Sequence, residues 1–498
     1  MRIEAVFSRS SLAANNKPTA LNVYQCIPWA RVAPGVPLRF ETTMRCLFFF
    51  LMASLGVACA QAYGTERSQP NVLFIYADDL GYGELGCYGG TRVPTPNIDS
   101  IAAGGVRFTQ GYVSAPLCSP SRAGLMTGHY QTRFGHENNA MGKGGGLPLT
   151  EQTLANRLKS LGYATCAVGK WHLGNASDRL PMVRGFDEYY GVTGNPGSYF
   201  TPKGFIDSRI SPEVQRIDDK DFYTTDAFAA RAADWIARHQ GSPWFLYLPF
   251  NAIHGPHDAS EKYLQRFEKV EDRKSRNLLA ILSAMDEAVG QVLDQLRKTG
   301  QENNTLVFFV SDNGAPHHDA SGGNGVLRGQ KYTCWEGGIR LPFLVQWKGT
   351  LPAGKLYEQP AVQLDVMPTC VAAAGGTIDP AWKLDGVDLL PYLTGEKQGR
   401  PHETLYWRID GRWAIRHGDW KLVLGQPERK GASPELFDLA ADIGEKNDLS
   451  AKNPEKVAEL KALWDAWNAE QAPPAAVKAK QARKNRAAKK AKRRATTT

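Results

Sequence analysis

The chain has 498 residues, of which 42% are hydrophobic and 22% are charged. This composition excludes a wholly disordered protein, and the length allows one large domain with a smaller one, or a few domains of ordinary size. The formal net charge of +9 misleads as a single value, because ten Lys and Arg residues and no acid lie from Lys478 onwards. The first 60 residues carry six basic and two acidic side chains, so the chain between these ends is mildly acidic. A basic face built for nucleic acid is therefore not expected.

Residues 44–62 have the features of a secretory signal peptide. One Arg precedes a short apolar run, and an Ala-x-Ala sequence follows it. The run is too short to span a membrane comfortably, so we expect cleavage near Ala60 or Ala62 and no transmembrane anchor. Because a signal peptide works from the extreme N-terminus, residues 1–43 are interpreted as a non-structural leader, with Met44 as the true start. The protein would then be exported, to the periplasm or outside the cell.

Eight Cys residues occur in the chain, and three of them lie in the first 60 residues. Five remain in the exported part, and an odd number fits one Cys that is chemically special in an oxidising compartment. The sequence leaves the pairing of the others open. These five are Cys87, Cys118, Cys166, Cys334 and Cys370.

Four continuous apolar runs predict strands that are buried on both faces, and polar residues follow each of them. Amphipathic helical stretches lie between the strands, so the alternation predicts an α/β sheet. Ligands of open α/β sheets bind beyond the carboxyl ends of the strands, so the polar residues are expected to line one pocket. The runs are 71–77, 164–168, 244–248 and 306–310, and the helical stretches are about 151–161, 225–238 and 276–298.

The pattern changes after about residue 400. Three short segments, 405–408, 413–416 and 420–424, alternate apolar and polar residues as in a small antiparallel sheet, and 454–467 is typical of a closing helix. The predicted fold class is α/β, with a mostly parallel mixed sheet flanked by helices in a large domain at 70–400. A small C-terminal subdomain at 401–470 holds the antiparallel sheet and the helix.

From residue 471 the chain is rich in Ala, Lys, Arg and Pro and has almost nothing to bury. We therefore predict a disordered basic tail at 471–498. A solvated tail is the favoured interpretation, and contact with an anionic polymer is the minority hypothesis.

The segment 116–128 is the one around which the chemistry is arranged. Ser119 suits an N-cap, Pro120 a first helical position and Gly128 a C-terminal end, so a helix is predicted over 120–127 with Cys118 just outside it. The helix N-terminus and Arg122 would favour an anion there and acidify the thiol. An isolated Cys in such a place is more often a buried structural residue.

The unbroken sequence Cys-x-Pro-Ser-Arg from Cys118, followed by Leu-Met-Thr-Gly, resembles the signature of the type I sulfatases of the alkaline phosphatase superfamily. Residues 162–172 resemble the second signature of that family, and the likeness extends over about 71–469. In that family the Cys is oxidised to formylglycine by a maturation enzyme, of the formylglycine-generating or the anaerobic kind. The resemblance therefore implies that Cys118 is the precursor of the nucleophile.

Four further residues offer only oxygen ligands, which suit calcium, or magnesium, better than zinc. Any one of them is also an ordinary cap or turn residue. The resemblance implies that all four hold calcium together with residue 118. They are Asp78, Asp79, Asp312 and Asn313.

The remaining candidate residues take their roles from the resemblance. Lys170 and His172 match the residues that hold and deprotonate the formylglycine hydroxyls, although alone they would be a surface lysine and a packed histidine. His254 and Lys331 match the sulfate-binding pair near the leaving oxygen. Arg122 adds fixed positive charge, which a sulfate monoester needs around its outer oxygens.

These expectations describe an exported sulfatase that hydrolyses sulfate monoesters through formylglycine and a calcium ion. Sulfated carbohydrate is the favoured substrate class and aryl sulfate the other, by family analogy and the export signal. Two alternatives stay open: a phosphomonoester or phosphonate hydrolase of the same superfamily, and a noncatalytic protein that binds sulfated polymer and keeps Cys118 as a thiol.

Overall fold

The computed structural model describes residues 69–139, 145–316, 323–426, 428–429 and 431–474. The predicted leader, signal peptide and nearly all of the basic tail lie outside these residues. Within them, no helix has both the length and the apolar character that crossing a membrane requires.

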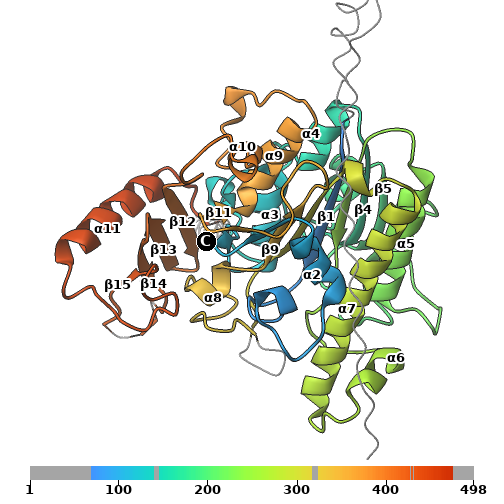
Figure 1. Cartoon of the computed structure of the whole chain (residues 1–498), viewed down its shortest axis with the longest axis horizontal. Coiled ribbons are helices and arrows are strands. Elements are labelled where there is room, and N and C mark those ends of the chain that lie inside the picture. The colour runs from blue at the N-terminus through green and yellow to red at the C-terminus, as the bar shows by residue number, and fades with distance from the viewer. Residues whose placement is uncertain (1–68, 140–144, 317–322, 427, 430, 475–498) are drawn as a thin grey trace, which may run out of the picture. The chain divides into compact units, whose positions relative to one another are not determined.

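A nine-stranded sheet forms the centre of the molecule (Figure 1). Its strands are β1 Asn71–Ala77, β2 Val106–Phe108, β4 Ala164–Lys170, β5 Glu188–Val192, β6 Phe205–Asp207, β7 Trp244–Pro249, β8 Thr305–Ser311, β9 Phe343–Gln346 and β10 Lys355–Tyr357. They follow the order β10-β2-β9-β8-β1-β7-β4-β5-β6. Strands β8, β1, β7 and β4 are neighbours and all pair in parallel, whereas β9 runs antiparallel to β8, β2 to β9 and β6 to β5. The predicted mostly parallel mixed sheet is confirmed.

The register places the carboxyl ends of the four predicted strands side by side. Ala77 at the end of β1 lies opposite Ser311 at the end of β8, and Tyr76 lies opposite Pro249 of β7. Because these strands are parallel, the residues that follow them meet at one edge of the sheet. Segments 78–79, 170–172, 251–254 and 312–313 are thereby brought together.

Helices cover both faces of the sheet, so the strands are apolar throughout. Leu73 and Ile75 of β1 belong to a core shared with α2, α5 and α7, whereas Phe74 and Tyr76 belong to a second core with α3, α4, α9 and α10. The predicted helices 225–238 and 276–298 are confirmed within three residues, and 151–161 is shorter than expected. The helices of this region are α2 Pro96–Ala103, α3 Cys118–Thr127, α4 Leu154–Ser160, α5 Thr224–Arg238, α6 Glu261–Leu264, α7 Arg273–Lys298, α8 Glu336–Ile339, α9 Val366–Ala373 and α10 Leu390–Thr394.

The C-terminal part forms a second, antiparallel sheet, as predicted (Figure 1). The hairpin between its first two strands turns through Asp410 and Gly411, which both have positive φ, the requirement of the tight two-residue turn. The closing helix packs on the sheet, with the Trp464 and Trp413 rings 4.5 Å apart. The elements are β12 Thr404–Ile409, β13 Arg412–His417, β14 Trp420–Leu424, β15 Glu435–Asp438 and α11 Pro454–Ala469. Two further strands, β3 Gly111–Tyr112 and β11 Ala361–Val362, pair in parallel and form a small sheet of their own.

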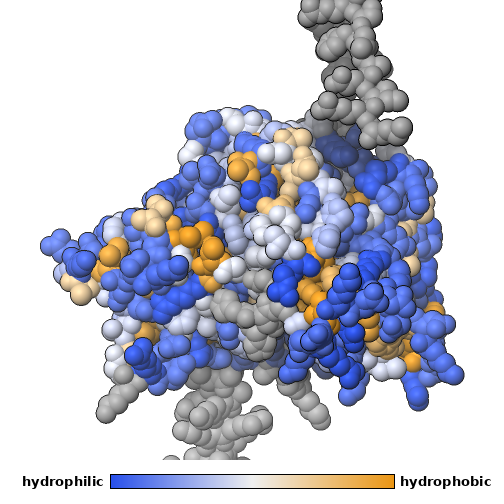
Figure 2. Space-filling model, turned by 60° about the horizontal axis from the view of Figure 1, so that its bottom comes forward, coloured by the Kyte–Doolittle hydropathy of each residue, from blue (hydrophilic) through white to orange (hydrophobic). Residues whose placement is uncertain are grey.

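On the face of the molecule in Figure 2, hydrophilic residues predominate and hydrophobic ones form several separate groups. Exposed large apolar side chains include Val183, Ile210 and Val326, which come from different segments. Scattered apolar residues are normal on protein surfaces. The polar residues at the sheet edge, most of them buried, are therefore the stronger indication of a functional site.

Candidate active site

The helix that carries Cys118 begins two residues earlier than the sequence predicts. α3 starts at Cys118 itself and its N-cap is Leu117 in extended conformation, so Ser119 lies inside the first turn and is not the N-cap. The predicted start was wrong because the Ser119 hydroxyl donates instead to the carbonyl oxygen of His172, at 2.6 Å. Gly128 ends the helix with a φ of 68°, as expected.

Three carboxylates follow β1 and β8 and lie against the start of α3. Asp78, Asp79 and Asp312 are all buried. An Asp312 oxygen accepts a hydrogen bond from the backbone N of Asp79 at 3.1 Å. Asn313 donates through Nδ2 to Asp79 Oδ1 at 2.7 Å, so the ends of the two strands are tied together.

Each of these carboxylates has a positively charged partner. Arg122 donates through Nε and Nη2 to Asp312 Oδ2, at 3.1 and 2.7 Å. Lys170 Nζ lies 2.5 Å from Asp78 Oδ2, and Lys331 Nζ lies 2.6 and 2.9 Å from the two oxygens of Asp79. Three cations and three carboxylates thus alternate in one buried cluster.

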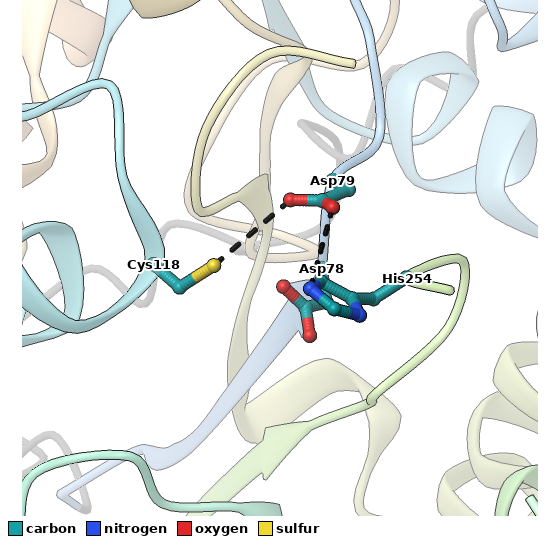
Figure 3. A group of neighbouring side chains, drawn as sticks. All are labelled: Asp78, Asp79, Cys118 and His254. Atoms are coloured by element: carbon teal, nitrogen blue, oxygen red, sulfur yellow. Dashed lines mark hydrogen bonds and ion pairs between the residues drawn. The ribbon is translucent and has the colours of Figure 1, made fainter. Parts of the chain in front are cut away.

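Cys118 and His254 approach this cluster from opposite sides, with the two aspartates between them (Figure 3). Cys118 Sγ lies 4.0 Å from Asp79 Oδ1, and His254 Nε2 lies 3.7 Å from Asp79 Oδ2. One potential ligand atom from each of Asp78, Asp79, Cys118 and His254 falls within 4.8 Å of all the others. Such a group has the size of a coordination sphere.

His172 is held in an unusual backbone conformation with a φ of 58°. Its backbone N donates to the carbonyl oxygen of Thr193 at 3.1 Å, and its own carbonyl accepts from Ser119. Its ring is buried, and its Nδ1 has no hydrogen-bond partner among the described residues. A buried residue with positive φ indicates that the surroundings impose the geometry.

The electrostatics of the cluster differ from the sequence expectation at Cys118. Burial raises the pKa of the thiol above its usual range, and the surrounding carboxylates raise it further against the pull of Lys170. The predicted acidification is therefore wrong for the unmodified side chain, because burial and three carboxylates outweigh the helix N-terminus. Burial lowers the pKa of His172, and the charges of Lys170 and Arg122 lower it further. His172 is therefore neutral at pH 7.

The carboxylates respond to burial in opposite ways. Burial alone would raise the pKa of Asp78, but Lys170, His254, Arg122 and Lys331 together hold it well below the usual value. Burial and the charge of Asp78 raise the pKa of Asp312 to about 7. A cation bound between them would favour the ionised form of both.

Two buried oxygens of the cluster test whether a cation fits here. Asp78 Oδ1 and Asn313 Oδ1 have no hydrogen-bond partner among the described residues. Unsatisfied buried oxygens are costly, and they are the ligands that calcium and magnesium prefer. The donor set therefore fits a hard divalent cation, with Asp78, Asp79, Asp312 and Asn313 as the residues that would hold it.

All of the candidate residues from the sequence lie in or directly around this cluster. Two further residues were missed, Asn195, whose Oδ1 lies 3.4 Å from Lys170 Nζ, and His136, whose Nε2 lies 2.7 Å from Ser119 Oγ. Asn195 lies in the loop between β5 and β6, and His136 lies between α3 and α4. Neither segment follows a periodic pattern, so spacing carried no signal for these residues. The five Cys residues of the described chain form no disulfide with one another.

Comparison with known proteins agrees with this geometry. The family model described as Sulfatase matches residues 70–376. The steryl-sulfatase of Rattus norvegicus is 34% identical over 84% of this chain and 91% of that protein, and the N-acetylgalactosamine-6-sulfatase of Canis lupus familiaris is 35% identical over 77% and 76%. The crystal structure of Ps i-CgsB in complex with k-i-k-neocarrahexaose is 30% identical, covers 82% of this chain and 94% of that one, and has a TM-score of 0.74. The chain therefore belongs to the sulfatase family, the enzymes that hydrolyse sulfuric esters.

Proposed function

We propose that this protein is an exported sulfatase that hydrolyses sulfate monoesters of carbohydrates, with Cys118 as formylglycine and a calcium ion at the carboxylate cluster. The observation that carries the proposal is the position of Cys118 at the first turn of α3, 4.0 Å from an Asp79 oxygen and among three buried cations. The signal-peptide pattern at 44–62 supports export.

The charge of the cluster suits an anionic substrate only when a cation is bound. The three carboxylates and the charges of Arg122, Lys170 and Lys331 cancel in pairs. With a divalent cation held by Asp78, Asp79, Asp312 and Asn313, the cluster would have an excess of two positive charges, which would attract the single negative charge of a sulfate monoester. Lys170 and Lys331, whose ammonium groups lie beside Asp78 and Asp79, would donate to the outer oxygens of the ester.

The chain's own residues divide the remaining work. Hydrated formylglycine supplies two hydroxyls at residue 118, one to attack sulfur and one whose deprotonation expels the sulfate. His172, neutral and buried, has a free Nδ1 to accept that proton. His254 and Lys331 assist the departing alcohol oxygen. His254 lies on the opposite side of Asp79 from Cys118 (Figure 3).

The proposed substrate class is based on the substrates that the names of the relatives give. The N-acetylgalactosamine-6-sulfatase acts on a sugar by its name, and Ps i-CgsB was solved with a neocarrahexaose. The steryl-sulfatase shows that the same family also accepts other alcohols. Sulfated carbohydrate is therefore the class to test first, with aryl sulfates as convenient reporters.

The deciding experiment combines mass spectrometry with a pair of esters. The tryptic peptide that contains Cys118, from protein made in its native host, is expected to carry the aldehyde or its hydrate. The same protein is expected to hydrolyse the sulfate ester of a chromogenic phenol much faster than the phosphate ester. Cys118→Ala, which keeps the helix, is expected to abolish turnover. A clear preference for phosphate would replace the proposal with a phosphomonoesterase, and an unmodified thiol that binds sulfated polymer without releasing sulfate would replace it with a binding protein.

A further inference from the structure

Lys331 lies on an irregular segment whose position depends on its two flanks. The segment 327–335 has no helix or strand before α8 begins at Glu336. Inside it, Lys331 donates through its backbone N to Ala315 at 3.1 Å, and Tyr332, with a φ of 72°, donates to Pro116 at 2.8 Å. An ammonium group at the end of a long flexible side chain on such a segment needs the backbone to be fixed from outside.

Glu445, more than 100 residues later in the chain, holds both flanks. Its Oε2 accepts from the backbone N of Glu336 at 2.7 Å, and its carbonyl oxygen accepts from Arg328 Nη1 at 3.0 Å. Arg328 precedes Lys331 by three residues and Glu336 follows it by five. A single residue of the C-terminal segment therefore clamps the two ends of the stretch that carries Lys331.

A buried charge network fixes Glu445 and α8 in turn. Lys421 Nζ, on β14, lies 2.8 Å from Glu445 Oε1 and 2.7 Å from Glu336 Oε1, and all three side chains are fully buried. The Tyr112 hydroxyl donates to Glu336 Oε2 at 2.6 Å. Buried ion pairs of this kind are weak sources of stability compared with apolar packing, but they define a single geometry.

The other side of the clamp is a stacked arginine. The Arg328 guanidinium lies over the Trp335 ring at 4.2 Å and pairs with Glu435 of β15 at 3.1 Å. The indole is in turn confined, because a Cβ on Gly425 would lie 2.4 Å from one of its ring atoms. Arg328 and Trp335 thus bring the residues before and after Lys331 into contact with each other.

We propose that Glu445, which lies between β15 and α11, is a positioning residue for Lys331 and thereby affects the rate of the reaction from outside the carboxylate cluster. The proposal rests on the role given to Lys331 in the proposed function. If Lys331 assists the leaving oxygen, its displacement by about 1 Å costs up to roughly 100-fold in rate. The loss falls most heavily on esters whose alcohol is a poor leaving group, because they need the assistance most.

The test uses Glu445→Gln, because an amide has one acceptor oxygen where Glu445 uses both carboxylate oxygens. The variant therefore cannot accept from the Glu336 N–H and from Lys421 at the same time, and the flank at Glu336 loses its fixed position. The matched control is Asp448→Asn, an acid-to-amide change three residues later, because the hydrogen bonds of Asp448 go to Leu436 and Ser450. We expect Glu445→Gln to lower kcat for aryl sulfates by roughly 10- to 100-fold and to steepen its dependence on the pKa of the leaving phenol. Asp448→Asn should leave that dependence unchanged.

A double-mutant cycle with Lys331→Met separates positioning from general destabilisation. In a protein that already carries Lys331→Met, Glu445→Gln is expected to cause no further loss of kcat. With Lys331 in place, Glu445→Asp is expected to lower kcat less than Glu445→Gln does. An equal loss for every leaving group, or a fully additive loss in the cycle, would overturn the proposal.

Failure of the proposed function has a different signature, namely wild-type protein that releases no sulfate from any ester. Crystal structures of Glu445→Gln and of the control Asp448→Asn then test the positioning role without any measurement of turnover. Displacement of Lys331 from Asp79 in Glu445→Gln alone supports it, and an unmoved Lys331 overturns it.

Discussion

Gly169 shows how one residue decides where a functional side chain lies. It directly precedes Lys170 and has a φ of 131°, and a Cβ there would lie 1.9 Å from the carbonyl oxygen of Pro249 on the neighbouring strand. Gly169→Ala is therefore expected to destabilise the protein by more than about 3 kcal/mol, because β4 and β7 must separate. Denaturant unfolding measures this change.

Gly162 provides the matched control for that substitution. It also has a positive φ, of 90°, but nothing lies within 4 Å of a Cβ at this position. Gly162→Ala should cost only the strain of the left-handed conformation, about 1–2 kcal/mol. An equal effect at the two glycines would show that the close approach of the strands is not what Gly169 provides.

The unsatisfied oxygen of Asp78 leads to a second prediction at this scale. If a cation binds between Asp78 and Asn313, added calcium should raise the melting temperature of the wild-type protein through preferential binding to the folded state. Asp78→Asn is expected to abolish this shift, whereas Asp99→Asn, which changes an acid of α2 outside the cluster, should keep it. A calcium shift of the same size in both variants would place the ion elsewhere. Thermal unfolding with and without a chelator gives the result.

Among the helices and strands, the sequence predicted the buried strands correctly but not the start of α3. The strands were predicted because residues 71–77 and 306–310 are apolar throughout, which is what burial on both faces requires. The polar residues of the site were predicted because they follow such strands directly. The start of α3 was not, because Ser119 takes its partner, the carbonyl of His172, from a segment more than 50 residues away. The pairing of Lys331 with Asp79 is likewise a contact between distant segments, which local patterns do not contain.

Asp365, in the turn that leads into α9, forms a pH-sensitive pair with His402, which lies between α10 and β12. His402 Nε2 lies 2.6 Å from Asp365 Oδ1, and the same carboxylate accepts hydrogen bonds from the backbone N of Val362 and of Val387. Burial opposes the charged imidazole, but the Asp365 carboxylate outweighs it, so the pKa of His402 is raised. A raised pKa in the folded state means that the pair stabilises fully below the ordinary value of about 6.5 and loses its effect as the pH rises through the raised value.

His402→Gln tests this sign. The wild-type protein should exceed the variant in unfolding free energy most at mildly acidic pH, by an amount on the order of 1 kcal/mol, and the difference should shrink towards alkaline pH. Urea unfolding at a series of pH values measures it. A difference that grows with pH would show that His402 is neutral in the folded protein.

At the scale of the whole molecule, the end of the described chain is hydrogen-bonded to the segment that follows α3. Gln471 Oε1 accepts from the Thr132 hydroxyl at 2.9 Å, Ala472 N donates to the Thr132 carbonyl at 3.0 Å, and Arg408 Nη2 donates to the Ala472 carbonyl at 2.6 Å. Thr132 lies only 14 residues after Cys118, so this contact holds the segment that follows α3.

Two truncations separate this contact from the basic tail. A chain that ends after Glu470 loses all three hydrogen bonds and is expected to lose about 1–3 kcal/mol of stability. A chain that ends after Pro474 keeps them and should unfold like the full-length protein. If both truncations behave alike, Gln471 and Ala472 do not contribute. Binding of each form to a sulfated polymer at low and high salt then tests the tail alone.

The order of the central strands along the chain also determines when the sheet can form during synthesis. β1 leaves the ribosome first, yet its two neighbours in the sheet, β7 and β8, begin only at Trp244 and Thr305. Nearly 200 residues separate Cys118 from the end of β8 at Ser311, which at about 5–20 residues per second takes on the order of 10–40 s to synthesise. During that time Asp312, which follows β8, has not yet been synthesised, and the sheet that buries Cys118 cannot close. If Cys118 is converted to formylglycine as proposed, the modifying enzyme therefore has tens of seconds in which the completed sheet does not yet enclose the thiol.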